Sequence, residues 1–205
     1  MFIEQLRVDT IKDIITNVYI VISEGSAMVI DPGGEPEKII NKLDELNVNL
    51  KYIVITHCHS DHIGAITELQ KAKGGEVLAS NDDGRMINNP IRNLSPFVGI
   101  KLDKINVNKF LNEGDKIVLG NETFEIIETP GHTKGGICIY CSKQNVLFSG
   151  DTIFKGTYGR TDLPSSSYKD IKNSISKLMK LPNETKVYPG HGEPTTIEHE
   201  KQIYE

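Results

Sequence analysis

Five of the six histidines in this 205-residue chain lie in three short clusters whose side chains could bind metal ions. With two aspartates they make seven nitrogen and oxygen donors: His57, His59, Asp61, His62, His132, Asp151 and His191. Zinc takes four ligands of these kinds, and a catalytic zinc site keeps one position for water. Seven protein donors and a shared hydroxide suit a two-metal hydrolytic centre, so the sequence predicts an enzyme.

The cluster at residues 57–62 is the most specific of these signals. His57 and His59 follow the apolar run 52–55, and side chains two residues apart on an extended segment point the same way, so these two can bind one ion together. Asp61 and His62 fall where a helix is predicted to begin. Their charge and lone pairs offset the repulsion between a helix N-terminus and a cation, so they suit a second ion beside the first.

The other three donors each follow a predicted strand and a turn that contains glycine. Taken singly, His132 and His191 have an ordinary alternative as surface or hydrogen-bonded core residues, and Asp151 as a cap or turn residue. They gain support from the first cluster, because solvated loops seldom place three imidazoles and a carboxylate within six residues. Asp151 has two carboxylate oxygens and is the natural bridge between ions that lie about 3.5 to 4 Å apart.

Strands must position these side chains, because each donor cluster follows a run of β-forming residues. The predicted strands cover residues 2–8, 18–22, 27–30, 52–55, 76–80, 116–119, 122–128, 136–140, 145–148 and 185–188. Helical spacing predicts helices at 36–46, 61–73, 167–181 and 196–204. Residues 81–110 show little periodicity and are interpreted either as a lid-like or connecting segment or as an irregular crossover.

The order of strands followed by helix occurs in both halves of the chain, with no linker rich in Ser or Pro between them. Two such halves can bury their apolar surfaces by packing sheet on sheet with the helices outside. We therefore expect a single α+β domain over residues 1–205, built as a four-layer αββα sandwich.

Charge and cysteine content indicate which class of substrate and which cellular compartment to expect. The net charge of −5 and the pI near 5.7 provide no broad positive field, so we expect a small-molecule substrate and no nucleic acid. Three cysteines, an odd number, do not suggest a disulfide framework and favour a reducing compartment. No segment reads as a signal peptide or a membrane span, so we expect a cytoplasmic protein, and the oligomeric state is left open.

The first cluster resembles the metallo-β-lactamase superfamily, whose signature His-x-His-x-Asp-His is matched at residues 57–62, and the resemblance spans nearly the whole chain. It implies a first metal bound by His57, His59 and His132, a second bound by Asp61, His62 and His191, and Asp151 as the bridge. It also implies that Asp31 supports the metal-binding loops without binding metal.

Within that superfamily the chain is most similar to the glyoxalase II group, in particular to short bacterial members that carry Gly-Arg-Thr-Asp-Leu-Pro, here residues 159–164. The likeness implies that Arg160 binds the glutathione moiety of the substrate. The alternative is that Arg160 pairs with Asp162 or caps the next helix. Full glyoxalase II enzymes continue into a helical domain that supplies much of the thiol pocket, whereas residues 192–205 follow the last metal histidine here, so the thiol carrier is not predicted.

The predicted function is hydrolysis of a thioester or ester, as in a hydroxyacylglutathione hydrolase. A metal-bridging hydroxide would attack the acyl carbon, and Asp61 or Asp151 would orient it. Two divalent ions are expected, with zinc preferred, although the same donors accept iron and manganese.

Four alternatives compete with this prediction. A persulfide dioxygenase would bind one iron through His57, His132 and Asp151, and a lactonase would use the same metal chemistry. The acidic pI argues against a nuclease of the superfamily, and the complete donor set argues against a non-catalytic binding module.

Three further features have structural interpretations. Cys138 and Cys141 have the spacing of a redox or zinc motif, but residues three apart on a strand face opposite sides, so we expect structural cysteines. Cys58 is expected to point away from the metals, and His199 to face solvent on the terminal helix.

Overall fold

The computed structural model describes residues 1–11, 14–99 and 101–204, arranged as two halves of strands and helices. The elements of the first half are β1 (Phe2–Ile11), β2 (Ile14–Ser23), β3 (Ser26–Ile30), α1 (Pro36–Glu45), β4 (Asn49–Ile55), α2 (Ser60–Ile63), α3 (Ile66–Lys73), β5 (Glu76–Ser80), α4 (Asn81–Met86), α5 (Pro90–Asn93), the 3-10 helix η1 (Ser95–Phe97) and β6 (Lys109–Leu111). Those of the second half are β7 (Lys116–Leu119), β8 (Glu122–Glu128), β9 (Ile137–Cys141), the 3-10 helix η2 (Ser142–Gln144), β10 (Val146–Gly150), β11 (Ile153–Phe154), β12 (Thr157–Tyr158), α6 (Tyr168–Leu178), β13 (Lys186–Pro189), β14 (Thr195–Thr196) and α7 (Ile197–Tyr204).

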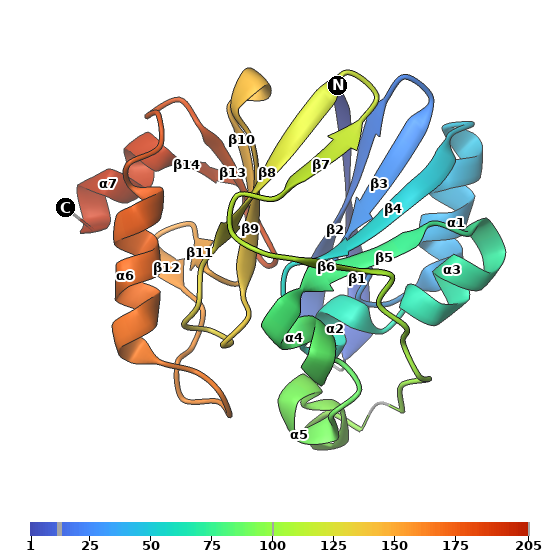
Figure 1. Cartoon of the computed structure of the whole chain (residues 1–205), viewed down its shortest axis with the longest axis horizontal. Coiled ribbons are helices and arrows are strands. Elements are labelled where there is room, and N and C mark those ends of the chain that lie inside the picture. Colours follow the sequence, from blue (N-terminus) through green and yellow to red (C-terminus); the bar gives the residue numbers. More distant parts are fainter. Residues whose placement is uncertain (12–13, 100, 205) are drawn as a thin grey trace.

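Each half forms one six-stranded sheet, and Figure 1 shows the two sheets side by side with helices on their outer faces. The first sheet has the order β1-β2-β3-β4-β5-β6, in which β3 to β6 are parallel. The second has the order β14-β13-β10-β9-β8-β7, in which β10 and β13 are parallel. The carboxyl ends of β4, β8, β10 and β13 lead into the segments that carry the predicted donors.

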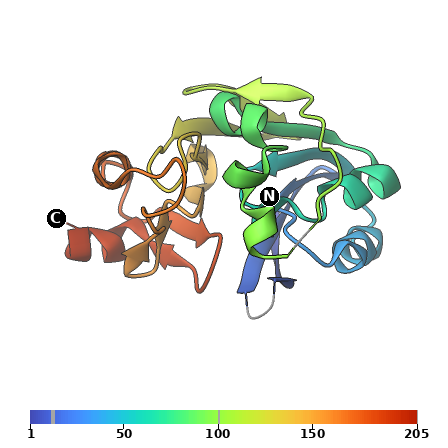
Figure 2. The ribbon, with the colours of Figure 1, turned by 90° about the horizontal axis from the view of Figure 1, so that it is seen from below.

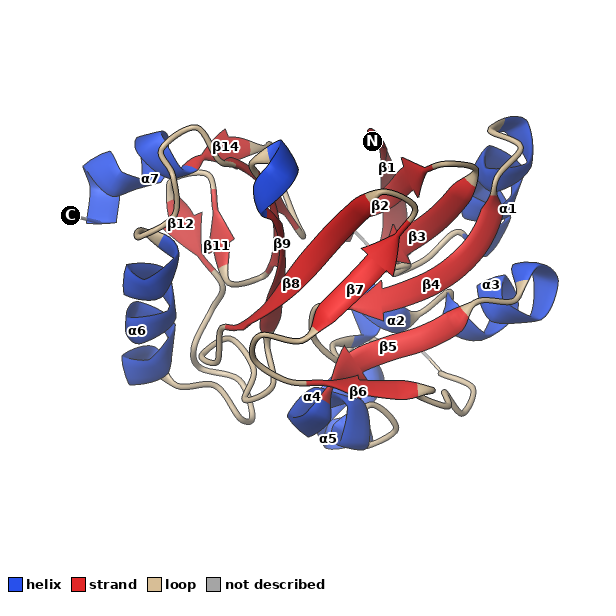
Figure 3. Cartoon of the chain, turned by 45° about the horizontal axis from the view of Figure 1, so that its top comes forward, coloured by secondary structure: helices blue, strands red, loops and turns tan. Residues whose placement is uncertain are grey.

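Three buried apolar clusters separate four layers of secondary structure, as Figure 3 illustrates with helices flanking the strands. One lies between the first sheet and helices α1 to α3, one between the two sheets, and one between the second sheet and helices α6 and α7. They are represented in turn by Val29 and Ile39, by Val54 and Phe124, and by Leu147 and Ile175. The predicted four-layer αββα sandwich is therefore confirmed.

The predicted continuous helix over residues 61–73 is wrong, because the structure breaks it into α2 and α3. The amide of Ala65 donates to the carbonyl oxygen of Pro32 at 2.9 Å, instead of continuing the helical ladder. A Cβ on Gly64 would lie 2.3 Å from the carbonyl oxygen of Gly33. The loop after β3 thus presses against the chain at this point and interrupts the helix.

The segment 81–110 shows little periodicity in the sequence, and its described residues, 81–99 and 101–110, contain three short helices and the start of β6. Side chains of Asn88 and Asn93 hold this segment together: Asn88 Nδ2 donates to the Ile105 carbonyl at 2.8 Å, and Asn93 Nδ2 donates to the Ile87 carbonyl at 2.8 Å. Short elements held by such side-chain bonds leave no periodic signal. None of the helices in the described ranges has the length and apolar character that crossing a membrane requires.

Candidate metal centre

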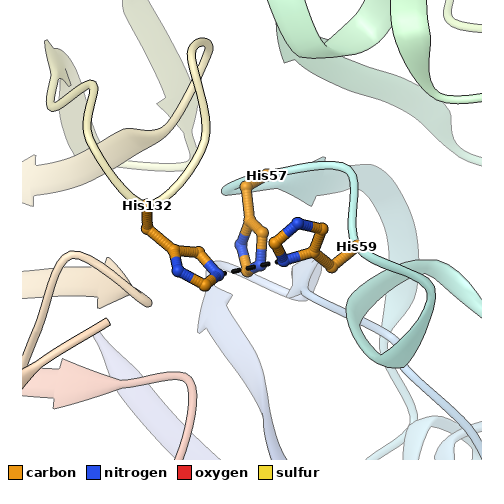
Figure 4. A group of neighbouring side chains, drawn as sticks. All are labelled: His57, His59 and His132. Carbon is orange, nitrogen blue, oxygen red and sulfur yellow. Dashed lines mark hydrogen bonds between the residues drawn. The ribbon is translucent and has the colours of Figure 1, made fainter. Parts of the chain in front are cut away.

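Three imidazoles meet at the first half of the candidate centre. His57 and His59 come from the loop after β4, and His132 comes from the loop between β8 and β9, which belongs to the other sheet. Figure 4 shows the three rings pointing toward one another, and one ring nitrogen of each lies within 4.8 Å of the other two. His59 Nδ1 and His132 Nε2 are 2.9 Å apart. The spacing of His57 and His59 therefore places both rings on one side of the chain, as predicted.

A second group of donors lies beside the first. His62 Nε2 is 3.2 Å from His191 Nε2 and 3.7 Å from Asp61 Oδ2, and His191 Nε2 is 3.3 Å from the same oxygen of Asp61. Asp61 and His62 lie in the first turn of α2, and His191 follows β13. Two nitrogens and one oxygen at these distances are suitable ligands for one further divalent ion.

Asp151, directly after β10, lies between the two groups. Its Oδ1 is 3.4 Å from His62 Nε2, and its Oδ2 is 3.5 Å from both His132 Nε2 and His191 Nε2. The carboxylate thus faces donors of both groups, which is the position that a bridging ligand requires. The structure brings all seven predicted residues together, and their role as metal ligands stays a prediction.

Hydrogen bonds behind the rings of His132 and His191 define which nitrogen of each imidazole faces the centre. His132 Nδ1 donates to the carbonyl oxygen of Arg160 at 2.9 Å, and His191 Nδ1 donates to that of Ile15 at 2.7 Å. Because the carbonyl oxygens can only accept, each Nδ1 carries the proton. Each Nε2 can therefore offer a lone pair to a cation, as is usual for histidines that bind metal.

Asp31 orients two further imidazoles, that of His62 directly and that of His57 through Thr56. The Asp31 carboxylate accepts from the Thr56 amide at 2.7 Å, from Thr56 Oγ1 at 2.6 Å and from His62 Nδ1 at 3.0 Å. Since the Thr56 hydroxyl donates to Asp31, it accepts from His57 Nδ1, which lies 3.1 Å away. Asp31 thus supports the donor loop from behind, in the position that the resemblance implies.

Buried polar atoms without partners show that the site fits metal ions. Within the described ranges, His57 Nε2 and Asp151 Oδ1 are buried and make no hydrogen bond. A buried lone pair that is left unpaired costs free energy, and a cation between these atoms would remove that cost. The donor set therefore fits two divalent ions with imidazole and carboxylate ligands.

Charges of opposite sign balance within the centre. Burial lowers the pKa of His57 well below its ordinary value and that of His59 to about 3. Burial also disfavours charged His62 and His191, but Asp151 and other nearby groups outweigh it and raise their pKa values to about 8 and about 11. Burial would raise the pKa of Asp151, yet the imidazoles hold it well below its usual range. A cation that binds here must therefore displace protons.

Close approaches explain two glycines next to donors. A Cβ on Gly190 would lie 2.3 Å from Asp151 Oδ1 and 2.6 Å from His62 Cε1. Gly131 has φ of 144°, and a Cβ there would lie 2.3 Å from the backbone nitrogen of Ile171. These turns therefore require glycine to bring the following histidines inward, as expected for the turn before His132.

The first sheet also holds the turn that carries His191, although β13 belongs to the second sheet. The Pro189 carbonyl accepts from Asn17 Nδ2 at 3.0 Å and from the Tyr19 hydroxyl at 2.6 Å, and the Gly190 carbonyl accepts from the Asn17 amide at 2.7 Å. These bonds join the two halves of the protein at the metal centre.

Asp83 is a positioning residue that the sequence analysis does not single out. Its buried carboxylate accepts from the Cys58 amide at 3.0 Å and from the Gly135 amide at 2.9 Å, so it joins the loop of the first histidine cluster to the loop of His132. The sequence holds one faint signal: Ser80 lies three residues earlier, and its hydroxyl accepts from the Asp83 amide at 3.2 Å as a helix N-cap.

Arg160 lines a cleft of about 730 Å³ that opens over the donors. Its guanidinium donates two hydrogen bonds of 2.7 Å to the Asp162 carboxylate, which is the pairing expected as the alternative to substrate binding. Both side chains are exposed, by 63% and 68%, so water screens the pair and the interaction is weak enough to open. Substrate binding by Arg160 stays a prediction.

The cysteines and the remaining histidine lie where they were expected. Cys138 packs in the cluster beneath α6, and Cys141 packs between the two sheets, so the pair faces opposite sides of β9. Cys58 is buried against the first sheet and its helices, away from the donors. The side chain of His199 is 47% exposed.

Comparison with known protein families gives one match over most of the chain: the metallo-beta-lactamase superfamily, at residues 11–191. Hydroxyacylglutathione hydrolase GloC of Haemophilus influenzae is 37% identical over 182 residues, which are 87% of this chain and 86% of that protein. Hydroxyacylglutathione hydrolase 1 of Vibrio vulnificus is 36% identical over 181 residues, 88% of this chain and 64% of that protein.

Solved structures show the same similarity. The BLEG-1 B3 metallo-beta-lactamase has a TM-score of 0.90 at 31% identity, over 98% of this chain and 97% of that one. The protein TTHA1623, solved in a di-iron-bound form, has a TM-score of 0.84 at 30% identity, over 98% of both chains.

Proposed function

The chain belongs to the metallo-β-lactamase superfamily, and we propose that it is a binuclear metal-dependent hydrolase of a thioester or ester, of the glyoxalase II type. The observation that carries the proposal is the position of Asp151 between two groups of three donors, each of which offers ligand atoms within 4.8 Å of one another. The relatives named hydroxyacylglutathione hydrolase support a thioester as the substrate.

We assign the first ion to His57, His59 and His132 and the second to Asp61, His62 and His191, with Asp151 shared by both. Bound divalent ions lower the pKa of water to about 7 and polarise a carbonyl group, which is the chemistry that hydrolysis needs at neutral pH. Zinc is the ion we expect, and the di-iron-bound relative supports our inference that such donors also accept iron.

The chain's own carboxylates have a second role in this proposal. Asp61 and Asp151 have pKa values below the usual range, because the imidazoles outweigh the effect of their burial, so both remain ionised and accept hydrogen bonds. They can orient a water molecule toward an acyl carbon that is bound in the cleft. A thiolate leaves without protonation by a side chain, so no dedicated protein acid is needed.

Attack by water on the acyl carbon breaks the bond from carbon to sulfur and yields a carboxylate, a thiol and a proton. The acidic pI supports a small molecule as the substrate, and the three free, buried cysteines support a reducing compartment such as the cytoplasm.

The one-iron dioxygenase alternative would use His57, His132 and Asp151 and would leave the group around His191 without a function. Dioxygenases of this kind retain these histidines too, so metal content and oxygen uptake distinguish the two functions. Elemental analysis of the purified protein, followed by assays on a panel of thioesters, tests the proposal. We expect two ions per chain and thioester hydrolysis that a chelator abolishes. One iron per chain with oxygen uptake on glutathione persulfide would contradict it, as would full activity without metal.

A further inference from the structure

The cleft over the metal centre has two apolar walls that come from distant parts of the sequence. Leu94, Phe97 and Val98 lie on or after α5 and η1, whereas Leu163 and Pro164 lie on the loop between β12 and α6. Figure 2 shows these two segments facing each other, seen from below. Five of the seven donors line the same cleft: His59, Asp61, His132, Asp151 and His191. A molecule whose reactive group lies at these donors therefore lies between the two walls.

The walls expose apolar surface that a ligand would cover. Phe97 is 74% exposed although it is a large aromatic residue, and Ile14, which also lines the cleft, is 37% exposed. Phe154 lies beside the metal centre, with its ring 6.0 Å from that of His191. Exposed apolar surface concentrated at a concave site is typical of a binding site for an apolar group.

The same cleft has few charged side chains that could bind a charged substrate. Among the described residues that line it, Arg160 is the one cationic side chain apart from the histidines of the centre, and Asp162 already pairs with it. The carboxylates of Asp61 and Asp151 face the centre itself. A substrate that presents several carboxylates would therefore find no free cationic side chain on the described part of the walls.

We propose that the cleft binds an apolar acyl group, aliphatic or aromatic, and that Phe97 and Leu163 determine this specificity from opposite walls. The inference rests on the proposed hydrolase and adds its substrate class: apolar acyl thioesters or esters in preference to small polar acyl groups such as lactoyl.

The first experiment measures kcat/KM on acetyl, butanoyl, hexanoyl and octanoyl thioesters of N-acetylcysteamine, a neutral thiol. Burying one methylene group gains about 0.8 kcal/mol, so kcat/KM should rise about fourfold for each methylene that the walls cover. With one carrier, S-octanoylglutathione should exceed S-lactoylglutathione. Values that stay flat across the series, or a preference for lactoyl, would overturn the inference.

Variants assign the effect to the walls. Phe97→Ala and Leu163→Ala should each reduce the ratio of octanoyl to acetyl kcat/KM by about tenfold, since a buried large apolar side chain contributes about 1.5 kcal/mol. Val118→Ala is the matched control: Val118 is 52% exposed on β7, outside the residues that line the cleft, and the variant should keep the wild-type ratio. An unchanged ratio in both wall variants would refute the assignment.

A binding measurement separates this inference from catalysis. The chain contains no tryptophan, so Phe97→Trp introduces one indole, which can be excited separately from the seven tyrosines, at an exposed position of the wall. The octyl thioether of N-acetylcysteamine, which cannot be hydrolysed, should shift its emission to the blue, and the methyl thioether should not. If the protein hydrolyses the acetyl thioester, but kcat/KM does not depend on acyl chain length and the emission does not shift, the apolar site is refuted and the proposed hydrolase stands. A shift without any thioester hydrolysis by the two-metal protein would refute the hydrolase.

Discussion

Substitution of Asp83 by asparagine should weaken metal binding although the side chain contacts none of the seven donors. The Asp83 carboxylate accepts one backbone amide from each of two donor loops, at Cys58 and at Gly135. An asparagine of the same shape can accept one of these hydrogen bonds, but its NH₂ group then faces the other amide. One of the two loops therefore loses its hydrogen bond, and its backbone N–H faces an NH₂ group that cannot accept it.

The structure suggests the size of this effect. A hydrogen bond to a charged group contributes about 1.5–3 kcal/mol, and the amide left buried without an acceptor adds to the loss. We expect the free energy of unfolding of Asp83→Asn to fall by about 2–3 kcal/mol, which in a chain of this size lowers Tm by roughly 4–12 °C. Loss of a side chain that hydrogen-bonds a metal ligand typically weakens metal affinity by about 10–100-fold. Asp83 holds the backbone of the two donor loops and not a ligand itself, so we expect the lower end of that range, roughly tenfold.

The assay is competition between the protein and a chromophoric chelator for zinc, together with thermal unfolding of the metal-free and metal-loaded forms. Asp82→Asn is the matched control on the same helix: the Asp82 side chain is 54% exposed and, among the described residues, pairs only with exposed Lys134 at 3.2 Å, so we expect unchanged metal affinity. Zinc affinity of Asp83→Asn within about twofold of the wild type, despite a lower Tm, would refute the positioning role.

Three further predictions follow from the donor geometry. Asp151→Ala should lose both bound metal and activity because it removes the shared ligand, and elemental analysis that still finds two ions per chain would contradict the bridge. The pKa of His62 in the metal-free protein is about 8, above its unfolded value near 6.5, so the stability that protonation contributes is fully present below about pH 6.5 and is lost as pH rises through about 8. Metal-free Tm should accordingly fall over that range, while zinc affinity measured by calorimetry rises as fewer protons are displaced from His62 and His191; affinity that is independent of pH between 6 and 9 would refute this. Asp162→Ala should free Arg160 and raise kcat/KM on a glutathione thioester over a neutral one by about two- to fivefold, and Arg160→Ala should not; equal ratios in both variants would exclude Arg160 from substrate binding.

Much of the secondary structure can be predicted from the sequence, because the patterns that indicate strands and helices are local. The predicted bounds of β5, β7 and β8 match the observed strands, since short runs of β-forming residues between turns reflect backbone geometry within a few residues. The two long predicted helices in the second half also form, although α6 is shorter than predicted. The helix over 61–73 failed because a contact with Pro32, more than thirty residues away in the sequence, interrupts it.

The sequence by itself predicted which side chains are candidate metal ligands, because imidazoles and carboxylates at that spacing after a buried strand have few other roles. Only the tertiary structure decided how they meet: His132 and His191 come from the sheet opposite to His57, and their tautomers depend on carbonyl groups of distant loops. The role of Asp83 and the pairing of Arg160 likewise depend on contacts between side chains and the backbone that no periodic pattern records. Periodicity indicates the secondary structure of one segment and which of its faces is buried. A site forms where segments that are distant in the sequence pack against each other, and periodicity holds no information on that packing.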